Sequence, residues 1–145
     1  GNERTAVCCL SSLNVETFLE WQNHPDFITD VMRFLDNVLE DFINKAPDSM
    51  ARAKYAAMRE RSVGLGVMGF HSFLQANMVP FDSVMAKSWN LRMFRHIKAG
   101  VDAASKQLAE ERGACPVHRG AQRQHEVGHR VGYAQVALGL LERHR

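Results

Sequence analysis

The most informative segment of the chain is Thr5-Ala6-Val7-Cys8-Cys9-Leu10-Ser11-Ser12-Leu13-Asn14. Up to Leu10 it mixes β-branched and small apolar residues, and two serines and an asparagine then end the run. This composition predicts a short buried strand that ends near Leu10. Consecutive strand residues point to opposite faces of a sheet, so Cys8 and Cys9 cannot share one role. We expect one thiol to line a site and the other to pack.

Structural packing is the ordinary alternative for either thiol, because free cysteine is a common buried small hydrophobe. The third cysteine, Cys115, lies far along the chain, and no secretory leader opens it. An odd cysteine count without a leader disfavours a secreted fold held by disulfides and favours a reducing, cytoplasmic setting.

Length and composition bound the class of protein. A chain of 145 residues is one domain by length, and 46% hydrophobic with 23% charged residues is typical of a soluble globular protein. No apolar run reaches the ~18 residues of a membrane span. The net charge of +2 gives no argument for a nucleic-acid partner.

The composition changes abruptly near Pro116. Residues 117–145 carry five arginines against two glutamates and four of the seven histidines, whereas all eight phenylalanines and all seven methionines lie upstream. We therefore expect two parts of different origin, residues 1–116 and residues 117–145.

Helical periodicity dominates the first part. A helix is expected from about Asp26, with Asn23 or Asp26 as its cap, and its opposite face, which includes Asp36, should be solvated. Its apolar face should hold Phe27, Val31, Phe34, Leu35, Val38, Leu39 and Phe42.

Three more helices and a second strand follow in the prediction. A helix over residues 50–60 should be capped by Asp48 or Ser49, a strand should lie near residues 63–67, and residues 70–74 should be helical. Asp82 should cap a long helix that ends near Arg112, before Gly113 and Pro116. The buried stripe of that long helix should hold Leu91, Phe94, Ile97, Val101, Ala104 and Leu108.

One or two strands cannot make a sheet, so either the helices form a bundle or the strands belong to a larger α/β sheet. The apolar strand near Cys8 favours the larger sheet.

The segment from Gly64 to Gly69 fits the dinucleotide pattern G-x-G-x-x-G. That fingerprint needs a strand just before it and an acidic residue about 20 positions later. Here a polar helical segment precedes it, and Asp82 comes too early. Close backbone packing where a strand turns into a helix is the better interpretation.

His125, Glu126 and His129 fit H-E-x-x-H, in which two histidines one helical turn apart grip zinc beside a general base. This pattern makes a zinc metallohydrolase the alternative function. Gly128 disfavours a helix here, and Gln135 stands where the longer pattern requires a third histidine. A helical interaction module without chemistry is a third interpretation.

Four segments, in order, resemble the large catalytic subunit of ribonucleotide reductase, in the manner of bacterial class I enzymes: residues 3–14, 30–39, 58–70 and 106–116. The resemblance implies a slice from the C-terminal half of a ten-stranded α/β barrel, mostly helical here with one or two strands. It implies reduction of ribonucleotides to deoxyribonucleotides by a thiyl-radical mechanism with a redox dithiol, for synthesis of DNA precursors.

The resemblance also assigns residues and partners. Cys8 matches the second member of the redox pair, Cys115 matches a structural position, and Cys9 falls where the family allows other residues. The implied partners are a ribonucleoside diphosphate, a small radical-generating subunit that bears a metal, thioredoxin or glutaredoxin, and a second copy of the full-length subunit. Adenosylcobalamin is the alternative radical source, allosteric nucleotides bind elsewhere in the family, and no cofactor is assigned within this chain.

The departures from the family pattern are equally specific. The radical cysteine between an asparagine and a glutamate, and the first redox cysteine, are not among the residues of this chain. The chain should therefore be inactive by itself, and a barrel cut from its sheet should expose apolar edges and aggregate. Helix 27–42 should still pack on helix 91–108.

Residues 117–145 lack the phosphate-binding segment that the family places there, so we expect an out-of-frame or chimeric end, disordered or helical, in which H-E-x-x-H is accidental. Sequencing the coding DNA tests this expectation. Family-like sequence should appear nearby in another frame; an intact frame with no such sequence nearby would count against it.

Overall fold

The computed structural model describes residues 4–116. Two strands, β1 (Cys9–Asn14) and β2 (Val63–Met68), pair in parallel, with Cys9 opposite Val63 and Asn14 opposite Met68. Because parallel neighbours need a long crossover, the chain between them forms helices. These are α1 (Phe18–Trp21), α2 (Phe27–Lys45) and α3 (Ala51–Glu60), with the short turns η1 (Val15–Thr17) and η2 (Asp48–Met50) leading into α1 and α3. After β2 come α4 (Phe70–Ala76) and α5 (Val84–Arg112).

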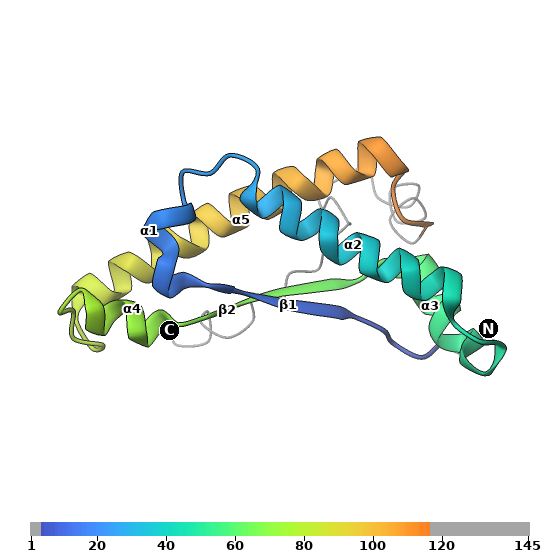
Figure 1. Cartoon of the computed structure of the whole chain (residues 1–145), viewed down its shortest axis with the longest axis horizontal. Helices are drawn as coiled ribbons and strands as arrows, with labels where there is room; N and C mark the ends of the chain where they lie inside the picture. Colours follow the sequence, from blue (N-terminus) through green and yellow to red (C-terminus); the bar gives the residue numbers. More distant parts are fainter. Residues whose placement is uncertain (1–3, 117–145) are drawn as a thin grey trace, which may run out of the picture.

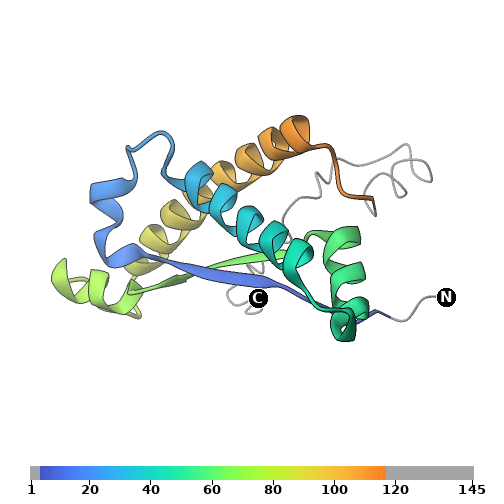
Figure 2. The same cartoon turned by 45° about the vertical axis from the view of Figure 1, so that its right-hand side comes forward.

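The helices cover one face of the two strands. In Figures 1 and 2, α2 and α5 lie on the same side of β1 and β2, and α2 contacts both strands as well as α5. Leu13, Val63 and Leu65 are buried on this covered face, whereas Leu10 and Met68, on the other face, are 77% and 69% exposed. We call the second face the open face. This arrangement is the expected slice of an α/β barrel.

The first strand differs from the prediction in position and burial. It begins at Cys9 and includes both serines, and of its residues only Leu13 is buried. The backbone groups of both serines are paired in the ladder with β2. This pairing keeps the serines in the strand, although their side chains favour an end to it. Asn14 then ends the strand, because its side chain accepts a hydrogen bond of 3.1 Å from the Glu16 amide and starts η1.

Helix α2 has its predicted length but buries a different stripe. Ile28, Met32, Leu35, Leu39 and Ile43 are its buried apolar residues, while Phe34 and Val38 are 64% and 41% exposed. The sequence is apolar around much of this helix, and the strands and α5 cover only one stripe. The expected packing of α2 on α5 is confirmed; a Cβ on Gly100 would lie 2.7 Å from Ile28 Cδ1.

Helix α1 was not predicted, because the segment before Asp26 was expected to be a linker. Helices α3, α4 and α5 follow the prediction except at their caps. Helix α3 begins after η2 rather than on a side-chain cap from Asp48 or Ser49, and Ser83, not Asp82, caps α5 by accepting from the Ala86 amide at 3.1 Å. Along α5 the predicted stripe is buried from Ile97 to Leu108, but Leu91 is 53% exposed.

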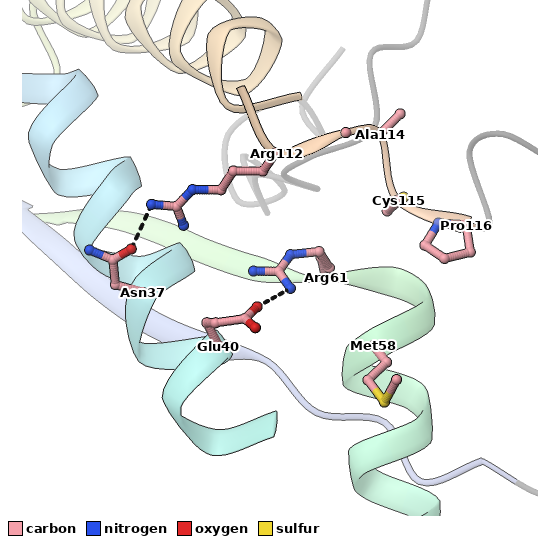
Figure 3. A pocket seen from close by; sticks show the side chains of 9 residues that line it. Asn37, Glu40, Met58, Arg61, Arg112, Ala114, Cys115 and Pro116 are labelled. Carbon is pink, nitrogen blue, oxygen red and sulfur yellow. Dashed lines mark hydrogen bonds and ion pairs between the residues drawn. The ribbon is translucent and has the colours of Figure 1, made fainter. Parts of the chain in front are cut away.

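A cavity of about 500 Å³ lies between α2, α3 and the end of α5 (Figure 3). Glu40 and Met58 line it from α2 and α3, and residues 112–116 close it from the other side. Cys115 lies on its wall and is buried, in line with the structural role expected for it.

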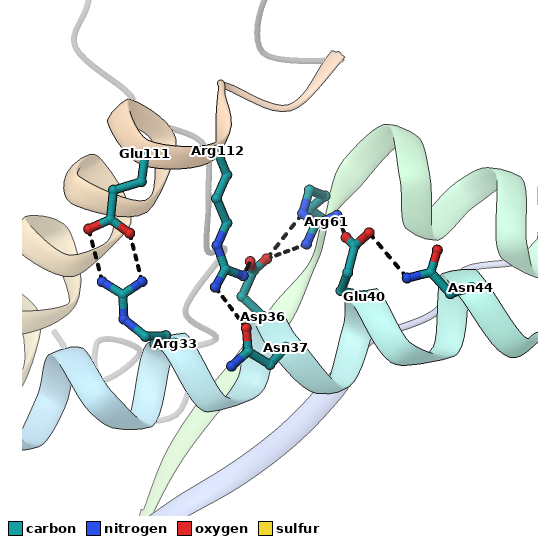
Figure 4. Close-up of polar contacts among 8 residues, drawn as sticks. All are labelled: Arg33, Asp36, Asn37, Glu40, Asn44, Arg61, Glu111 and Arg112. Atoms are coloured by element: carbon teal, nitrogen blue, oxygen red, sulfur yellow. Dashed lines mark hydrogen bonds and ion pairs between the residues drawn. The ribbon is translucent and has the colours of Figure 1, made fainter.

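The carboxylate of Asp36 is the polar centre of the fold (Figure 4). It was expected to be solvated, yet it is only 2% exposed. Arg61, which precedes β2 with a left-handed φ of 47°, donates to Asp36 Oδ1 from Nε at 3.0 Å and Nη2 at 2.8 Å. Arg112, at the end of α5, contacts Asp36 Oδ2 and donates to Asn37 Oδ1 at 2.7 Å. This cluster ties α2 to the start of β2 and to the end of α5.

A second ion pair, between Arg33 and Glu111, compensates an unfavourable charge at the end of α5. Glu111 runs against the helix dipole, but Arg33 of α2 donates to both of its carboxylate oxygens, at 2.6 and 2.9 Å. The Arg33 hydrogen bonds, followed by one from Gln107, lower the pKa of Glu111 from its ordinary 4.5 to about 2.

Substituting Asp36→Asn should lower the free energy of unfolding by about 3–5 kcal/mol, because two arginines then lose a buried counter-charge. Urea unfolding followed by circular dichroism measures this loss. The matched control is Asp102→Asn in the exposed Lys98–Asp102 pair, which should cost about 0.5 kcal/mol or less. Equal, small losses in both variants would contradict the central role of Asp36.

The Arg33–Glu111 pair should give a defined acid dependence. Since the folded pKa lies below the ordinary value, the pair's stabilisation is present above pH 4.5 and is lost as the pH falls toward 2. The difference in Tm between the natural chain and Glu111→Gln should therefore shrink between pH 5 and pH 2. A difference that stays constant over this range would show that the pair does not act in this way.

Candidate redox site on the open face of the sheet

Cys8 lies directly before β1 and is exposed. Its side chain shares the open face with Leu10, since an ideal Cβ on Gly64 would contact both the Cys8 sulfur and the Leu10 side chain. The Cys8 thiol lies 3.7 Å from the carbonyl oxygen of Cys9, to which it donates a weak hydrogen bond. The thiol is thus held near the backbone and remains accessible.

Cys9 faces the other way. It is partly buried and packs against the hydrophobic core beneath the helices. The expectation that the adjacent thiols lie on opposite faces is confirmed. The covered position of Cys9 suits packing, and the open position of Cys8 suits contact with a ligand.

Neither thiol has a lowered pKa. Partial burial raises the pKa of Cys8, and the pKa of Cys9 is raised first by burial and then by the neighbouring Cys8. A thiol activated as a nucleophile has a lowered pKa, usually beside a cation or a helix N-terminus. The site therefore suits a thiol that donates hydrogen and electrons to a partner better than one that attacks as a standing thiolate.

The glycines of the segment from Gly64 to Gly69 allow close packing within β2 and at the turn that follows it. Gly64 and Gly66 lie inside β2, opposite Leu10 and Ser12 of β1. Gly69 turns the chain from β2 into α4 with a φ of 83°, and a Cβ there would lie 2.5 Å from Asn14 Oδ1. Close packing at the strand-to-helix turn is confirmed. The contact of Gly64 with Leu10 and Cys8 was not predicted, although alternating glycines in a strand can signal such close approach.

His125, Glu126 and His129 lie outside the described residues. Within residues 4–116 no group of three His, Cys, Asp or Glu side chains could hold a metal ion. Over the same range, no helix combines the length and apolar character needed to cross a bilayer.

Comparison with known proteins gives a consistent family. The family model for the ribonucleotide reductase barrel domain matches residues 1–137. The chain is 48% identical over 111 residues to the ribonucleoside-diphosphate reductase large subunit of Invertebrate iridescent virus 6, a match that covers 77% of this chain and 12% of that protein. It is 35% identical over 114 residues to the vitamin B12-dependent ribonucleoside-diphosphate reductase of Mycobacterium tuberculosis strain H37Rv, covering 75% of this chain and 16% of that protein.

A solved structure agrees with the sequence matches. The alpha subunit of the class Id ribonucleotide reductase of Actinobacillus ureae superposes with a TM-score of 0.77 at 37% identity, covering 83% of this chain and 24% of that subunit. The chain thus spans less than a quarter of each of these three relatives. The expected division at Pro116 stays a prediction. With a family match over most of its length and the same strand and helix arrangement as a solved relative, this chain belongs to the ribonucleotide reductase family, as part of its large-subunit barrel domain.

Proposed function

We propose that this chain supplies one reducing thiol, Cys8, to the conversion of ribonucleotides into deoxyribonucleotides by a full-length large subunit. The single observation that carries the proposal is the exposed Cys8 thiol on the open face of a parallel strand pair whose other face is covered by helices. In a closed barrel the helices lie outside, so the open face is the one turned toward the interior. Names of relatives with up to 48% identity support the reaction class.

The chemistry requires a second thiol from outside this chain. Replacing the 2′-hydroxyl of the ribose by hydrogen consumes two thiols and releases one deoxyribonucleotide, one disulfide and one water. The two thiols together lose two electrons and two protons, which balance the new C–H bond and the water. A thiyl radical held elsewhere in the subunit starts the reaction by taking the 3′ hydrogen, and a thiol–disulfide exchange restores the pair.

The raised pKa of Cys8 agrees with this role. A protonated thiol carries the hydrogen that the substrate needs, and its oxidation to a disulfide needs no permanent thiolate. Cys9 lies on the covered face and takes no part.

The proposed partners follow from the same reaction. They are a ribonucleoside diphosphate, a small radical-generating subunit, thioredoxin or glutaredoxin as the electron donor, and a second copy of the full-length subunit, in the cytoplasm. The relatives include a vitamin B12-dependent reductase and a class Id subunit, so a metal-bearing small subunit and cobalamin both stay as candidate radical sources.

In the full-length subunit that carries this chain, Cys8→Ser should abolish multiple turnover with thioredoxin, because serine cannot form the disulfide. The matched control is Cys9→Ser, the same change one residue away on the covered face, which should keep most of the activity. Deoxynucleotide formation measured by chromatography decides between them. Full turnover in Cys8→Ser, or equal loss in both variants, would overturn the proposal.

The same assay on the 145-residue chain alone should give no deoxynucleotide, since the radical cysteine and the cysteine that would form the disulfide with Cys8 are not among its residues. Turnover by the isolated chain would contradict the proposed division of labour.

A further inference from the structure

Gly64 lies beside the side chains of Leu10 and Cys8 on the open face. It pairs with Leu10 in the parallel register, so both residues point to the same side of the sheet. An ideal Cβ on Gly64 would lie 2.4 Å from Leu10 Cδ2 and 3.5 Å from Cys8 Sγ. The first distance is far below the 3.5–4.0 Å at which carbon atoms make favourable contact. A terminal methyl of Leu10 therefore occupies the space where any other residue at position 64 would place its side chain.

Backbone conformation does not explain this glycine. Gly69 and Gly113 have φ values of 83° and 85°, which favour glycine, but Gly64 does not have a positive φ. Glycine inside a strand also weakens the strand, because it loses more chain entropy on folding and has no side chain to pack. Its presence at position 64 is thus explained by the space beside Leu10 and Cys8.

The leucine that fills this space is not itself locked in a core. Leu10 is 77% exposed, and the atom that a new Cβ would meet is the free end of its side chain. A methyl group at position 64 would therefore push Leu10 aside without breaking the fold. It would also rest against the Cys8 sulfur at van der Waals distance and remove solvent from one side of the thiol.

We propose that Gly64 is a positioning residue for Cys8: by lacking a side chain it seats Leu10 across β2 and leaves the approach to the thiol open. The importance of Gly64 for the reaction rests on the proposed function of Cys8. The effect of Gly64 on access to the Cys8 thiol rests only on the contacts of Gly64 with Leu10 and Cys8.

Gly66 provides a matched control on the same strand and face. A Cβ there would lie 3.2 Å from Ser12 Oγ and 3.8 Å from the Ser11 carbonyl oxygen, with neither Leu10 nor Cys8 within 4 Å. Gly64→Ala and Gly66→Ala therefore make the same chemical change in the same strand, but only the first reaches the thiol.

The test measures alkylation of Cys8 by iodoacetamide in the full 145-residue chain between pH 6 and pH 10, with peptide mapping by mass spectrometry to separate Cys8 from Cys9. A covered thiol ionises less readily, so Gly64→Ala should slow alkylation of Cys8 at pH 7 by about threefold or more, equivalent to a rise of about half a pKa unit. The midpoint of its pH profile should move upward. Gly66→Ala should match the natural chain in both rate and midpoint. Circular dichroism should show the same helix content in all three proteins.

Equal Cys8 alkylation rates in the natural chain and both variants would overturn the proposal. If Gly64→Ala does not fold, Leu10→Ala combined with Gly64→Ala removes the collision and leaves the methyl beside the sulfur. Its Cys8 should still react more slowly than that of Leu10→Ala alone, and equal rates in that pair would also overturn the proposal. Alkylation needs no substrate or electron donor, so it tests the role of Gly64 without the reductase reaction. The redox role of Cys8 is tested separately, and it would be overturned by full turnover of Cys8→Ser.

Discussion

The parallel pairing of β1 with β2 determines which side chains the helices cover and which they leave open. Its register, Cys9 opposite Val63, places one alternating set of side chains under α2 and leaves the other set open. A slip of one residue would exchange the two sets and move Cys8 to the covered side. The buried Asp36, held by Arg61 just before β2 and by Arg112 at the end of α5, ties the crossover helix α2 to the start of β2 and to the end of α5.

Sequence reasoning succeeded where structure is set by near neighbours along the chain. The lengths of α2, α3 and α5 follow from apolar spacing and from breakers such as Gly113 and Pro116, and the alternation of Cys8 and Cys9 follows from strand geometry. It failed where partners are distant in sequence. The burial of Asp36 depends on arginines 25 and 76 residues away, and the serines of β1 are held by a strand some 50 residues later. The space around Cys8 depends on the same pairing, so the alternating glycines of β2 signal a close approach but do not say which side chains make it.

The exposed apolar residues are explained by the family assignment, because the chain is one part of a larger barrel domain. Leu10 and Met68 on the open face, and Phe34 and Val38 on α2, are large side chains without cover among residues 4–116. Because the chain spans 24% of the Actinobacillus ureae subunit it superposes on, such exposure is expected of one slice of a larger barrel. The fold of the slice is nevertheless specific, since its core joins both strands to α2, α4 and α5.

The redox state of Cys8 after a single turnover of the full-length enzyme decides whether this thiol belongs to the reducing pair. The pre-reduced enzyme is given substrate without an external reductant, and its thiols are then blocked and mapped by mass spectrometry. Cys8 should be found in a disulfide with a cysteine outside this chain, one for each deoxynucleotide formed, while Cys9 remains a thiol. Product formation that leaves Cys8 as a free thiol would show that Cys8 is not a reducing thiol of this reaction.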